Sequence, residues 1–367
     1  MYGATLQPIL GREGAAPAVL PLDGTTRAPV IDIDNILVYD RKMAELRRDS
    51  LSGNWVVVGY GATKSGEVGL CPFCPGNESL TPTAIREYKG PDNNWLLRCF
   101  PATNPMFVIE VEENRRAEGM YDKMSNVGAH EIIVESRSHT KTMSAYTEEE
   151  FLLLIDMYQE RMSDLKKDRR FKYVQVFKNH GELAGSFVFH PHSHVLATPI
   201  VPSGIAREAV NCRTHYVQKE RCLVCDIVNQ EIRQGKRVVS MNRNFVAVCP
   251  FASRFPYETW VLPRSHEAFF ENTRDQNIKH DFAAIVLDLM KRIEQLANAY
   301  TIEIHTCPTL SSGDAHEQDV NGSDYYHWHL EILPRDFRSS KYKREDEFPV
   351  VSVTPEEAAH ALKTQKG

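Results

Sequence analysis

HPHSHVLAT, residues 190–198, places three alternating histidines in front of an apolar run. Alternate residues of a β-strand point to the same face, so this stretch predicts a strand that presents His190, His192 and His194 together. A second stretch, HWHLEILP at residues 327–334, repeats a His-x-His motif followed by an apolar run. The two copies indicate a chain built from two related halves.

Two further motifs recur in the same order in each half. Each half has a Cys-x-x-Cys, as CPFC at 71–74 and CLVC at 222–225. Each also has an Arg-Ser-His at the end of an expected strand, as SRSH at 136–139 and PRSH at 263–266. Two copies of one α+β unit explain this order better than chance. We expect a leader or surface strap at residues 1–35, an N-terminal domain at 36–205 and a C-terminal domain at 206–367.

Hydrophobic periodicity predicts eight strands and two long helices. The first helix begins at Thr147, where Thr147 and Glu150 form a capping box, and its apolar stripe runs from Phe151 to Leu165. The second helix is predicted near Asp281–Tyr300. The predicted strands are Trp55–Tyr60, Glu131–Glu135, Tyr173–Lys178, Val195–Val201, Phe245–Cys249, Thr259–Leu262, Ile302–His305 and His329–Leu333.

The composition is that of a globular protein with ample material for a core. The chain has 367 residues, 42% of them hydrophobic and 25% charged, which suits two domains. A formal charge of -6, with no block of Lys or Arg, does not favour nucleic-acid binding. No apolar run approaches the roughly 18 to 20 residues of a membrane span, and no signal peptide is evident. We therefore expect a cytoplasmic protein that binds neither nucleic acid nor membrane.

Each Cys-x-x-Cys pair can form a metal site with two histidines of its own half. Without a secretion signal, such pairs indicate metal or redox chemistry before disulfides. A lone pair is also typical of a redox site or a tight turn, but two copies in the same histidine contexts favour zinc. Four protein ligands would make both ions structural, at about two Zn²⁺ per chain. The expected ligands are Cys71, Cys74, His139 and His190 in the first site, and Cys222, Cys225, His266 and His327 in the second.

His192 is the candidate nucleophile. Neutral imidazole is abundant near neutral pH and attacks phosphorus well, and zinc on His190 would fix where His192 points. Glycines in the preceding segment, NHGELAGS at 179–186, would let backbone N–H groups approach a phosphate. The expected substrate-binding residues there are Asn179, Gly181, Gly185 and Ser186. On spacing alone, three histidines that share one metal or cap a strand are an equally good interpretation.

The combined motifs resemble the galactose-1-phosphate uridylyltransferase family. The likeness is carried by CPFCPGNE at 71–78, by the NHG that opens the 179–186 segment and by HPHS at 190–193. It extends from RRDSLSGNW at 47–55 to HWHLEILP, about three quarters of the chain. This family is the branch of the histidine-triad superfamily whose fold is a tandem repeat of an α+β unit. The resemblance therefore implies two histidine-triad-like units, each an antiparallel sheet with packed helices.

The resemblance also implies a two-step exchange. The residue matching His192 takes a nucleoside monophosphate from a nucleotide sugar, releases a sugar phosphate, and then passes the nucleotide to a phosphate acceptor. Asn179 matches an asparagine that contacts the nucleotide phosphates, and zinc is held by residues matching the first cysteine and histidine set. Asn104, in FPATNP at 100–105, resembles a position near the base and ribose. Family members are usually homodimers with the active site near the subunit boundary, so we expect a homodimer.

Three segments depart from the family pattern. His194 stands where the family usually has a Gln that supports the phosphate of the intermediate, and small histidine-triad hydrolases have His there. We count His194 as catalytic with His192, since it could donate a proton to a leaving oxygen. The family's Arg-rich turn is GATKS at 61–65, which keeps only Lys64 to contact phosphate. Its glycine-rich hexose segment is KYKREDEFP at 341–349, without glycine, which weighs against galactose as the sugar.

The motifs and their departures from the family pattern are therefore compatible with three functions. The first is a nucleotidyltransferase, the second a hydrolase or phosphorylase of nucleotide sugars or dinucleoside polyphosphates, and the third a catalytically silent zinc-stapled nucleotide-binding module. Some family members bind a second metal through histidines in the contexts of His305 and His329. The complete second Cys/His set competes for that role, so we expect His305 and His329 to support a site or the core. The other cysteines are expected to be buried or inert: Cys99, Cys212, Cys249 and Cys307.

Overall fold

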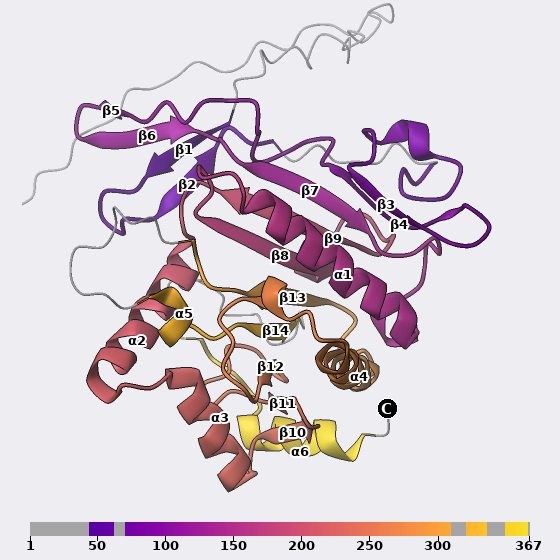
Figure 1. Cartoon of the computed structure of the whole chain (residues 1–367), viewed down its shortest axis with the longest axis vertical. Helices are drawn as coiled ribbons and strands as arrows, with labels where there is room; N and C mark the ends of the chain where they lie inside the picture. The colour runs from indigo at the N-terminus through magenta and orange to yellow at the C-terminus, as the bar shows by residue number, and fades with distance from the viewer. Residues whose placement is uncertain (1–43, 62–69, 310–320, 336–348, 366–367) are drawn as a thin grey trace, which may run out of the picture. The chain divides into compact units, whose positions relative to one another are not determined.

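Two antiparallel sheets and six α-helices make up residues 44–61, 70–309, 321–335 and 349–365, which the computed structural model describes (Figure 1). The predicted α+β class is confirmed. The smaller sheet has the order β2-β1-β6-β5, and the larger one has ten strands. The strands are β1 (Glu45–Arg48), β2 (Trp55–Val58), β3 (Arg86–Lys89), β4 (Trp95–Pro101), β5 (Arg116–Glu118), β6 (Tyr121–Ser125), β7 (Ala129–Val134), β8 (Tyr173–His180), β9 (His192–Thr198), β10 (Val238–Met241), β11 (Phe245–Val248), β12 (Thr259–Pro263), β13 (Tyr300–His305) and β14 (His329–Pro334).

The larger sheet contains the predicted repeat. Its order is β10-β11-β12-β14-β13-β8-β9-β7-β4-β3. Read outward from the centre, one half is β8, β9, β7, β4 and β3, and the other is β13, β14, β12, β11 and β10. Both halves therefore wind in the same way, and β13 pairs with β8 to join them into one sheet. Each His-x-His motif leads into the second strand from the centre, β9 or β14.

Six α-helices lie within the described residues. They are α1 (Glu148–Leu165), α2 (Ser203–Lys219), α3 (Leu223–Gln234), α4 (Gln276–Ile293), α5 (Gly322–Tyr325) and α6 (Pro355–Thr364). Helix α1 has the predicted capping box, because the Thr147 side chain accepts from the Glu150 N–H and the Glu150 side chain accepts from the Thr147 N–H. The predicted bounds of α4 were wrong at both ends. Asp275 caps the helix by accepting from two backbone N–H groups, and the chain leaves the helix at Glu294 to enter β13.

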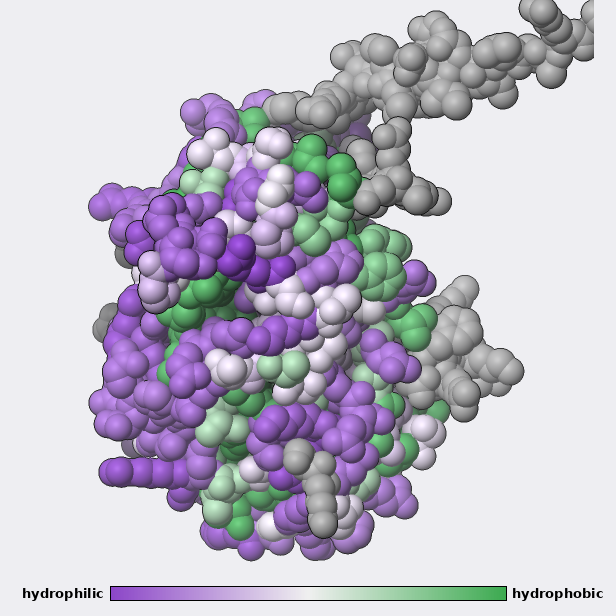
Figure 2. All heavy atoms as spheres, turned by 90° about the vertical axis from the view of Figure 1, so that its right-hand side faces the viewer, coloured by the Kyte–Doolittle hydropathy of each residue, from purple (hydrophilic) through white to green (hydrophobic). Residues whose placement is uncertain are grey.

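One face of the larger sheet is covered by α1 and α4 (Figure 1). Val195 and Ala197 of β9, Val176 of β8 and Ile302 of β13 are buried with the apolar stripes of both helices in one cluster. Residues that alternate with these point to the opposite face of the sheet. Figure 2 shows that one side of the molecule is mostly hydrophilic, with hydrophobic residues in separate patches between polar ones.

Several elements were not predicted from the sequence. Helices α2, α3, α5 and α6 were missed, as were six strands, β1, β3, β4, β5, β6 and β10. Strand β9 begins at His192 rather than at Val195, and it ends at Thr198, one residue before Pro199, which fits the missing N–H of proline. The expected boundary between residues 205 and 206 lies in the first turn of α2 and stays a prediction. No helix within the described residues is long and apolar enough to cross a membrane. The expected leader, 1–35, lies outside the described residues.

Candidate functional site

Strand β9 presents its histidines on the face of the sheet that α1 and α4 leave uncovered. Ser193 and Val195 are buried on the helix side, so the alternating His192 and His194 point to the open side. The register places His194 beside Phe177 of β8 on one side and Ile132 of β7 on the other. His190 lies two residues before the strand. The apolar alternation of β9 thus fixes where the imidazoles of His192 and His194 point.

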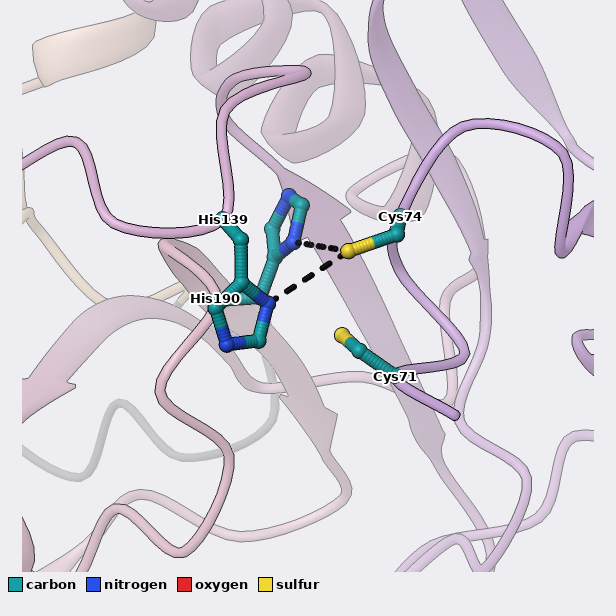
Figure 3. A group of neighbouring side chains, drawn as sticks. All are labelled: Cys71, Cys74, His139 and His190. Carbon is teal, nitrogen blue, oxygen red and sulfur yellow. Dashed lines mark hydrogen bonds between the residues drawn. The ribbon is translucent and has the colours of Figure 1, made fainter. Parts of the chain in front are cut away.

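The four residues of the first predicted metal set lie together (Figure 3). One donor atom from each lies within 4.8 Å of all the others. The Cys74 Sγ is 3.4 Å from the His139 Nδ1 and 3.6 Å from the His190 Nδ1. A tetrahedral zinc site with its usual bond lengths has S···N edges of about 3.6 Å. The geometry and the donor chemistry of Cys71, Cys74, His139 and His190 therefore fit a zinc ion.

The second predicted set has the same arrangement. Its donor atoms also lie within 4.8 Å of one another. The Cys225 Sγ is 3.7 Å from the His266 Nδ1 and 3.5 Å from the His327 Nδ1, and the Cys222 Sγ is 3.7 Å from the His327 Nδ1. The residues of both halves could thus hold a metal ion.

The far nitrogens of these histidines also suit metal binding. The Nε2 of His190 donates to the Ser136 carbonyl at 2.7 Å, and that of His327 donates to the Pro263 carbonyl at 3.1 Å. His266 donates from Nε2 to the Ser323 carbonyl at 2.8 Å. Histidines that bind metals commonly donate the other ring N–H to a backbone carbonyl, which fixes the tautomer. Each of these three imidazoles therefore turns a lone pair on Nδ1 toward the cysteines.

His192 is oriented in the opposite sense. Its Nδ1 donates to the His190 carbonyl oxygen at 2.7 Å, which leaves the lone pair on Nε2. Burial lowers the pKa of His192 to about 4, so the ring is neutral at neutral pH. The side chain is 7% exposed and packs against the Phe73 ring at 5.2 Å. His190 therefore links the metal set to the candidate nucleophile through one hydrogen bond.

His194 lies next to His192 and is held from two sides. Its ring stacks on Phe177 at 4.8 Å with an interplanar angle of 10°. Its Nδ1 is 3.0 Å from the Nε2 of His130, a residue of β7 that the sequence analysis did not single out. The predicted strand began at Glu131, so His130 was placed just outside it. Burial lowers the pKa of His194 well below its usual value, with His192 and His130 adding to the effect.

The expected phosphate loop has its own internal hydrogen bonds. The N–H groups of Ala184 and Ser186 both donate to the Gly181 carbonyl. Gly181 has φ +80°, and a Cβ there would lie 2.8 Å from both the Ala299 Cβ and the Asn298 oxygen. Packing therefore accounts for glycine at position 181. Gly185, with φ +83°, has open space around it.

The other expected substrate contacts belong to several segments of the chain. Asn179 pairs with Thr301 across β8 and β13. Its side chain is half-buried and makes no hydrogen bond to another of the described residues. The Ser186 hydroxyl donates to the Val188 carbonyl, and the Asn104 amide donates to the Gly61 carbonyl at 2.8 Å. Lys64 lies outside the described residues, as does nearly all of the segment 341–349.

Models of two domains match almost the whole chain beyond residue 43. The N-terminal domain of galactose-1-phosphate uridyl transferase matches residues 44–202, and the C-terminal domain of the same enzyme matches residues 209–343. The chain belongs to the galactose-1-phosphate uridylyltransferase family. The resemblance inferred from the motifs is confirmed.

Individual members of the family are similar over most of their length. An ADP-glucose phosphorylase from Arabidopsis thaliana is 25% identical over 81% of this chain and 86% of its own. A galactose-1-phosphate uridylyltransferase from Thermotoga maritima is 27% identical over 88% of this chain and 98% of its own. The crystal structure of the Arabidopsis phosphorylase with bound ADP-glucose covers 88% of this chain and 100% of its own, at 25% identity and a TM-score of 0.69. A mutant uridylyltransferase structure covers 87% and 96%, with a TM-score of 0.72.

In this member of the family a buried charged network lies under strand β9. The Lys178 Nζ donates to Glu135 at 2.7 Å and to the His192 carbonyl at 3.4 Å. Tyr146 and Ser193 also donate to the Glu135 carboxylate. Burial alone would raise the pKa of Glu135, but Lys178 and these donors lower it below its usual value. The network thus holds a charged pair on the helix side of β9.

A second titratable cluster occupies the same open face in the other half, around His305 and His329, which were expected to support a site or the core. His305 donates to Glu208 of α2 at 3.0 Å and lies 3.4 Å from Glu303. Burial would lower the pKa of His305, but Glu331 and the other carboxylates raise it to about 10. Ligand atoms of Glu208, His305 and His329 lie within 4.8 Å of one another, so a cation could bind here as well. No pattern in the sequence indicated Glu208, because α2 was not predicted.

Proposed function

We propose that this chain is a nucleotidyltransferase that transfers a nucleoside monophosphate from a nucleotide sugar to a phosphate acceptor through His192. The observation that carries the proposal is the His192 ring. Its Nδ1–H is bound to the His190 carbonyl, its ring is neutral, and its Nε2 lone pair is left for attack on phosphorus. Membership of the family supports the same chemistry.

The first step forms a bond between the His192 Nε2 and the α-phosphorus of the nucleotide sugar. The bond from that phosphorus to the bridging oxygen breaks, and the sugar phosphate leaves with the electron pair. The imidazole ring gains positive charge as the bond forms. The His190 carbonyl, which accepts from Nδ1 at 2.7 Å, is aimed at the nitrogen where that charge is shared.

In the second step a phosphate oxygen of the acceptor attacks the same phosphorus. The P–N bond breaks, and its electron pair returns to the His192 Nε2. The neutral ring is restored, and no net proton transfer is needed when both leaving group and acceptor are phosphate anions. Asn179 and His194, on the same open face, are the proposed contacts to the transferred phosphate. Asn104, Gly181, Gly185, Ser186 and Lys64 remain proposed substrate contacts.

The two cysteine and histidine sets are proposed to hold about two Zn²⁺ per chain in structural roles. Zinc in the first set would fix the His190 ring, and so the carbonyl that orients His192. No step of the transfer runs through either ion. We also propose that the protein is a cytoplasmic homodimer and that residues 36–205 and 206–367 are its two histidine-triad-like domains.

A phosphorylase is the second candidate, with inorganic phosphate as acceptor. It is favoured by His194, which replaces the family's usual Gln, and by the similarity to an enzyme named ADP-glucose phosphorylase. The segment 341–349 lacks the glycines expected for hexose contact, which weighs against a hexose phosphate acceptor that needs a backbone approach.

The acceptor distinguishes the two functions. Purified protein is incubated with UDP-glucose, UDP-galactose or ADP-glucose, in parallel with no acceptor, with inorganic phosphate and with hexose 1-phosphates. A transferase gives product only with a hexose phosphate, and a phosphorylase gives a nucleoside diphosphate only with inorganic phosphate. Equal product without any acceptor means that water is the second substrate. No turnover together with tight nucleotide binding would instead support a silent binding module.

A further inference from the structure

His130 of β7 makes two hydrogen bonds that determine where its protons lie. Its Nδ1 accepts from the Met106 backbone N–H at 3.3 Å. Its Nε2 lies 3.0 Å from the Nδ1 of His194. Burial lowers the pKa of His130 to about 4, so the ring is neutral near pH 7. A neutral imidazole has one N–H and one lone pair.

The Met106 contact decides the tautomer of both rings. A backbone N–H can only donate, so the lone pair of His130 is on Nδ1 and its hydrogen is on Nε2. That hydrogen is donated to His194, so the Nδ1 of His194 is the acceptor. The hydrogen of His194 must then be on Nε2. One backbone amide therefore sets the protonation pattern of two successive side chains.

The Met106 amide is itself held in place. The Asn126 side chain, which is 2% exposed, donates to the Met106 carbonyl at 2.9 Å. The Val108 N–H donates to the Asn126 carbonyl at 3.0 Å, which joins the two segments a second time. The loop before β5 is thus fixed to the residue that follows β6. The backbone N–H of Met106 is therefore held in the position from which it donates to His130.

We propose that His130 is a positioning residue that holds His194 as a neutral Nε2–H hydrogen-bond donor, in place of the amide donor that the family usually has at this position. Phe177 fixes the plane of the His194 ring by stacking, and His130 fixes which nitrogen carries the hydrogen. The His194 Nε2–H then serves the phosphate transferred by His192, whose ring lies 5.1 Å away. This assignment of His194 rests on the proposed function.

A glutamine at position 194 would not need His130. The amide group of glutamine always has N–H donors, whereas imidazole presents a donor at Nε2 only in one of its two neutral tautomers. The histidine at 194 and the histidine at 130 are therefore expected to act as a pair. Each histidine is expected to contribute to the transfer only when the other is present.

The test replaces His130 in two backgrounds, the wild type and His194→Gln. His130→Phe removes both hydrogen bonds and keeps a ring, whereas His130→Gln keeps an oxygen for the Met106 N–H and an amide N–H for His194. In the wild-type background we expect His130→Phe to lower kcat by about 10- to 100-fold, with a smaller change in KM. This is less than the roughly 100- to 1,000-fold cost of removing a preorganised donor, because part of the His194 population keeps the Nε2–H tautomer. His130→Gln should recover most of that loss. In the His194→Gln background, both substitutions should change kcat by less than about threefold, because no imidazole at position 194 is left for His130 to orient. Such a non-additive effect of two substitutions shows that the two residues are coupled.

The tautomer is read directly by ¹H–¹⁵N NMR of histidine-labelled protein, which needs no turnover. We expect His194 as the Nε2–H form in the wild type and in His130→Gln, and a mixture or the other tautomer in His130→Phe. An Nδ1–H tautomer at His194 in the wild type would overturn the proposal, as would equal losses of kcat in both backgrounds. If His192 forms no nucleotide adduct, the proposed function fails while the NMR result still decides the role of His130.

Discussion

Replacing Lys178 by methionine is expected to destabilise the protein by about 3 kcal/mol at neutral pH. Lys178 and Glu135 are 3% and 0% exposed, and their charges are 2.7 Å apart. Removal of one partner of a buried ion pair commonly costs about 3–5 kcal/mol, because the other charge is left without its counter-ion. The Glu135 carboxylate would keep its hydrogen bonds from Tyr146 at 2.7 Å and from Ser193, so we expect the lower end of that range.

The way in which this loss of stability depends on pH follows from the pKa of Glu135. Its pKa is below the usual value in the folded protein, so its stabilising contribution is present above that usual value and is lost as the pH falls through the folded pKa. Without Lys178, burial raises the Glu135 pKa instead. The difference in stability between the wild type and Lys178→Met should therefore be largest near neutral pH and shrink in acid.

Urea unfolding of metal-replete protein measures the effect, from the shift in midpoint at constant slope. Lys167→Met is the matched control, because Lys167 is 76% exposed and its pair with Asp164 at 3.0 Å should contribute less than about 1 kcal/mol. The double variant Lys178→Met/Glu135→Gln should regain most of the loss, since neither partner is then left charged. A single variant as stable as Lys167→Met, or a double variant no better than the single one, would refute this account of the network.

Three further predictions concern the metals, the loop and acid stability. Cys74→Ser should lose one bound zinc and most nucleotide transfer, whereas Cys225→Ser should lose the other zinc and keep transfer at His192, as measured by elemental analysis and by activity. Gly181→Ala should lower the free energy of unfolding by about 1–3 kcal/mol more than Gly185→Ala, as measured in urea. Both glycines have positive φ, but only at position 181 would the added Cβ lie 2.8 Å from other atoms, so equal losses would count against the role of packing. The folded pKa of His130 is about 4 against an ordinary value of 6.5, so this group removes stability as the pH falls from 6.5 to 4. His130→Gln should therefore lose less stability over that range, by up to about 3 kcal/mol, and an unchanged pH profile would contradict the shift.

Local patterns predicted the elements whose signals lie within a few residues. The capping box at Thr147 and Glu150 set the start of α1, and the apolar run after the histidines indicated β9, although its start at His192 was missed. The repeated motifs also grouped the residues of both Cys/His sets, whose possible donor atoms lie within 4.8 Å of one another in the structure. Recurrence made this possible, because two copies of the same order are hard to explain in any other way.

Contacts between distant segments were beyond such patterns. His130 meets His194 only because β7 pairs with β9, and its tautomer depends on an amide from the loop at Met106. Glu208 reaches His305 from a helix with only two buried apolar residues, so no stripe indicated it. The end of α4 was misplaced because its apolar spacing continues to Leu296, although the helix ends at Ile293.

The most direct test of the proposed mechanism asks whether His192 carries the nucleotide. Wild-type protein and His192→Ala are each mixed with UDP-glucose or ADP-glucose without acceptor, and intact-protein and peptide mass spectrometry follow. We expect the wild type to gain the mass of one nucleoside monophosphate on the peptide that contains residue 192, and an acceptor phosphate to remove it. The variant should gain none. An adduct on another residue, or active turnover by His192→Ala, would contradict the proposed mechanism.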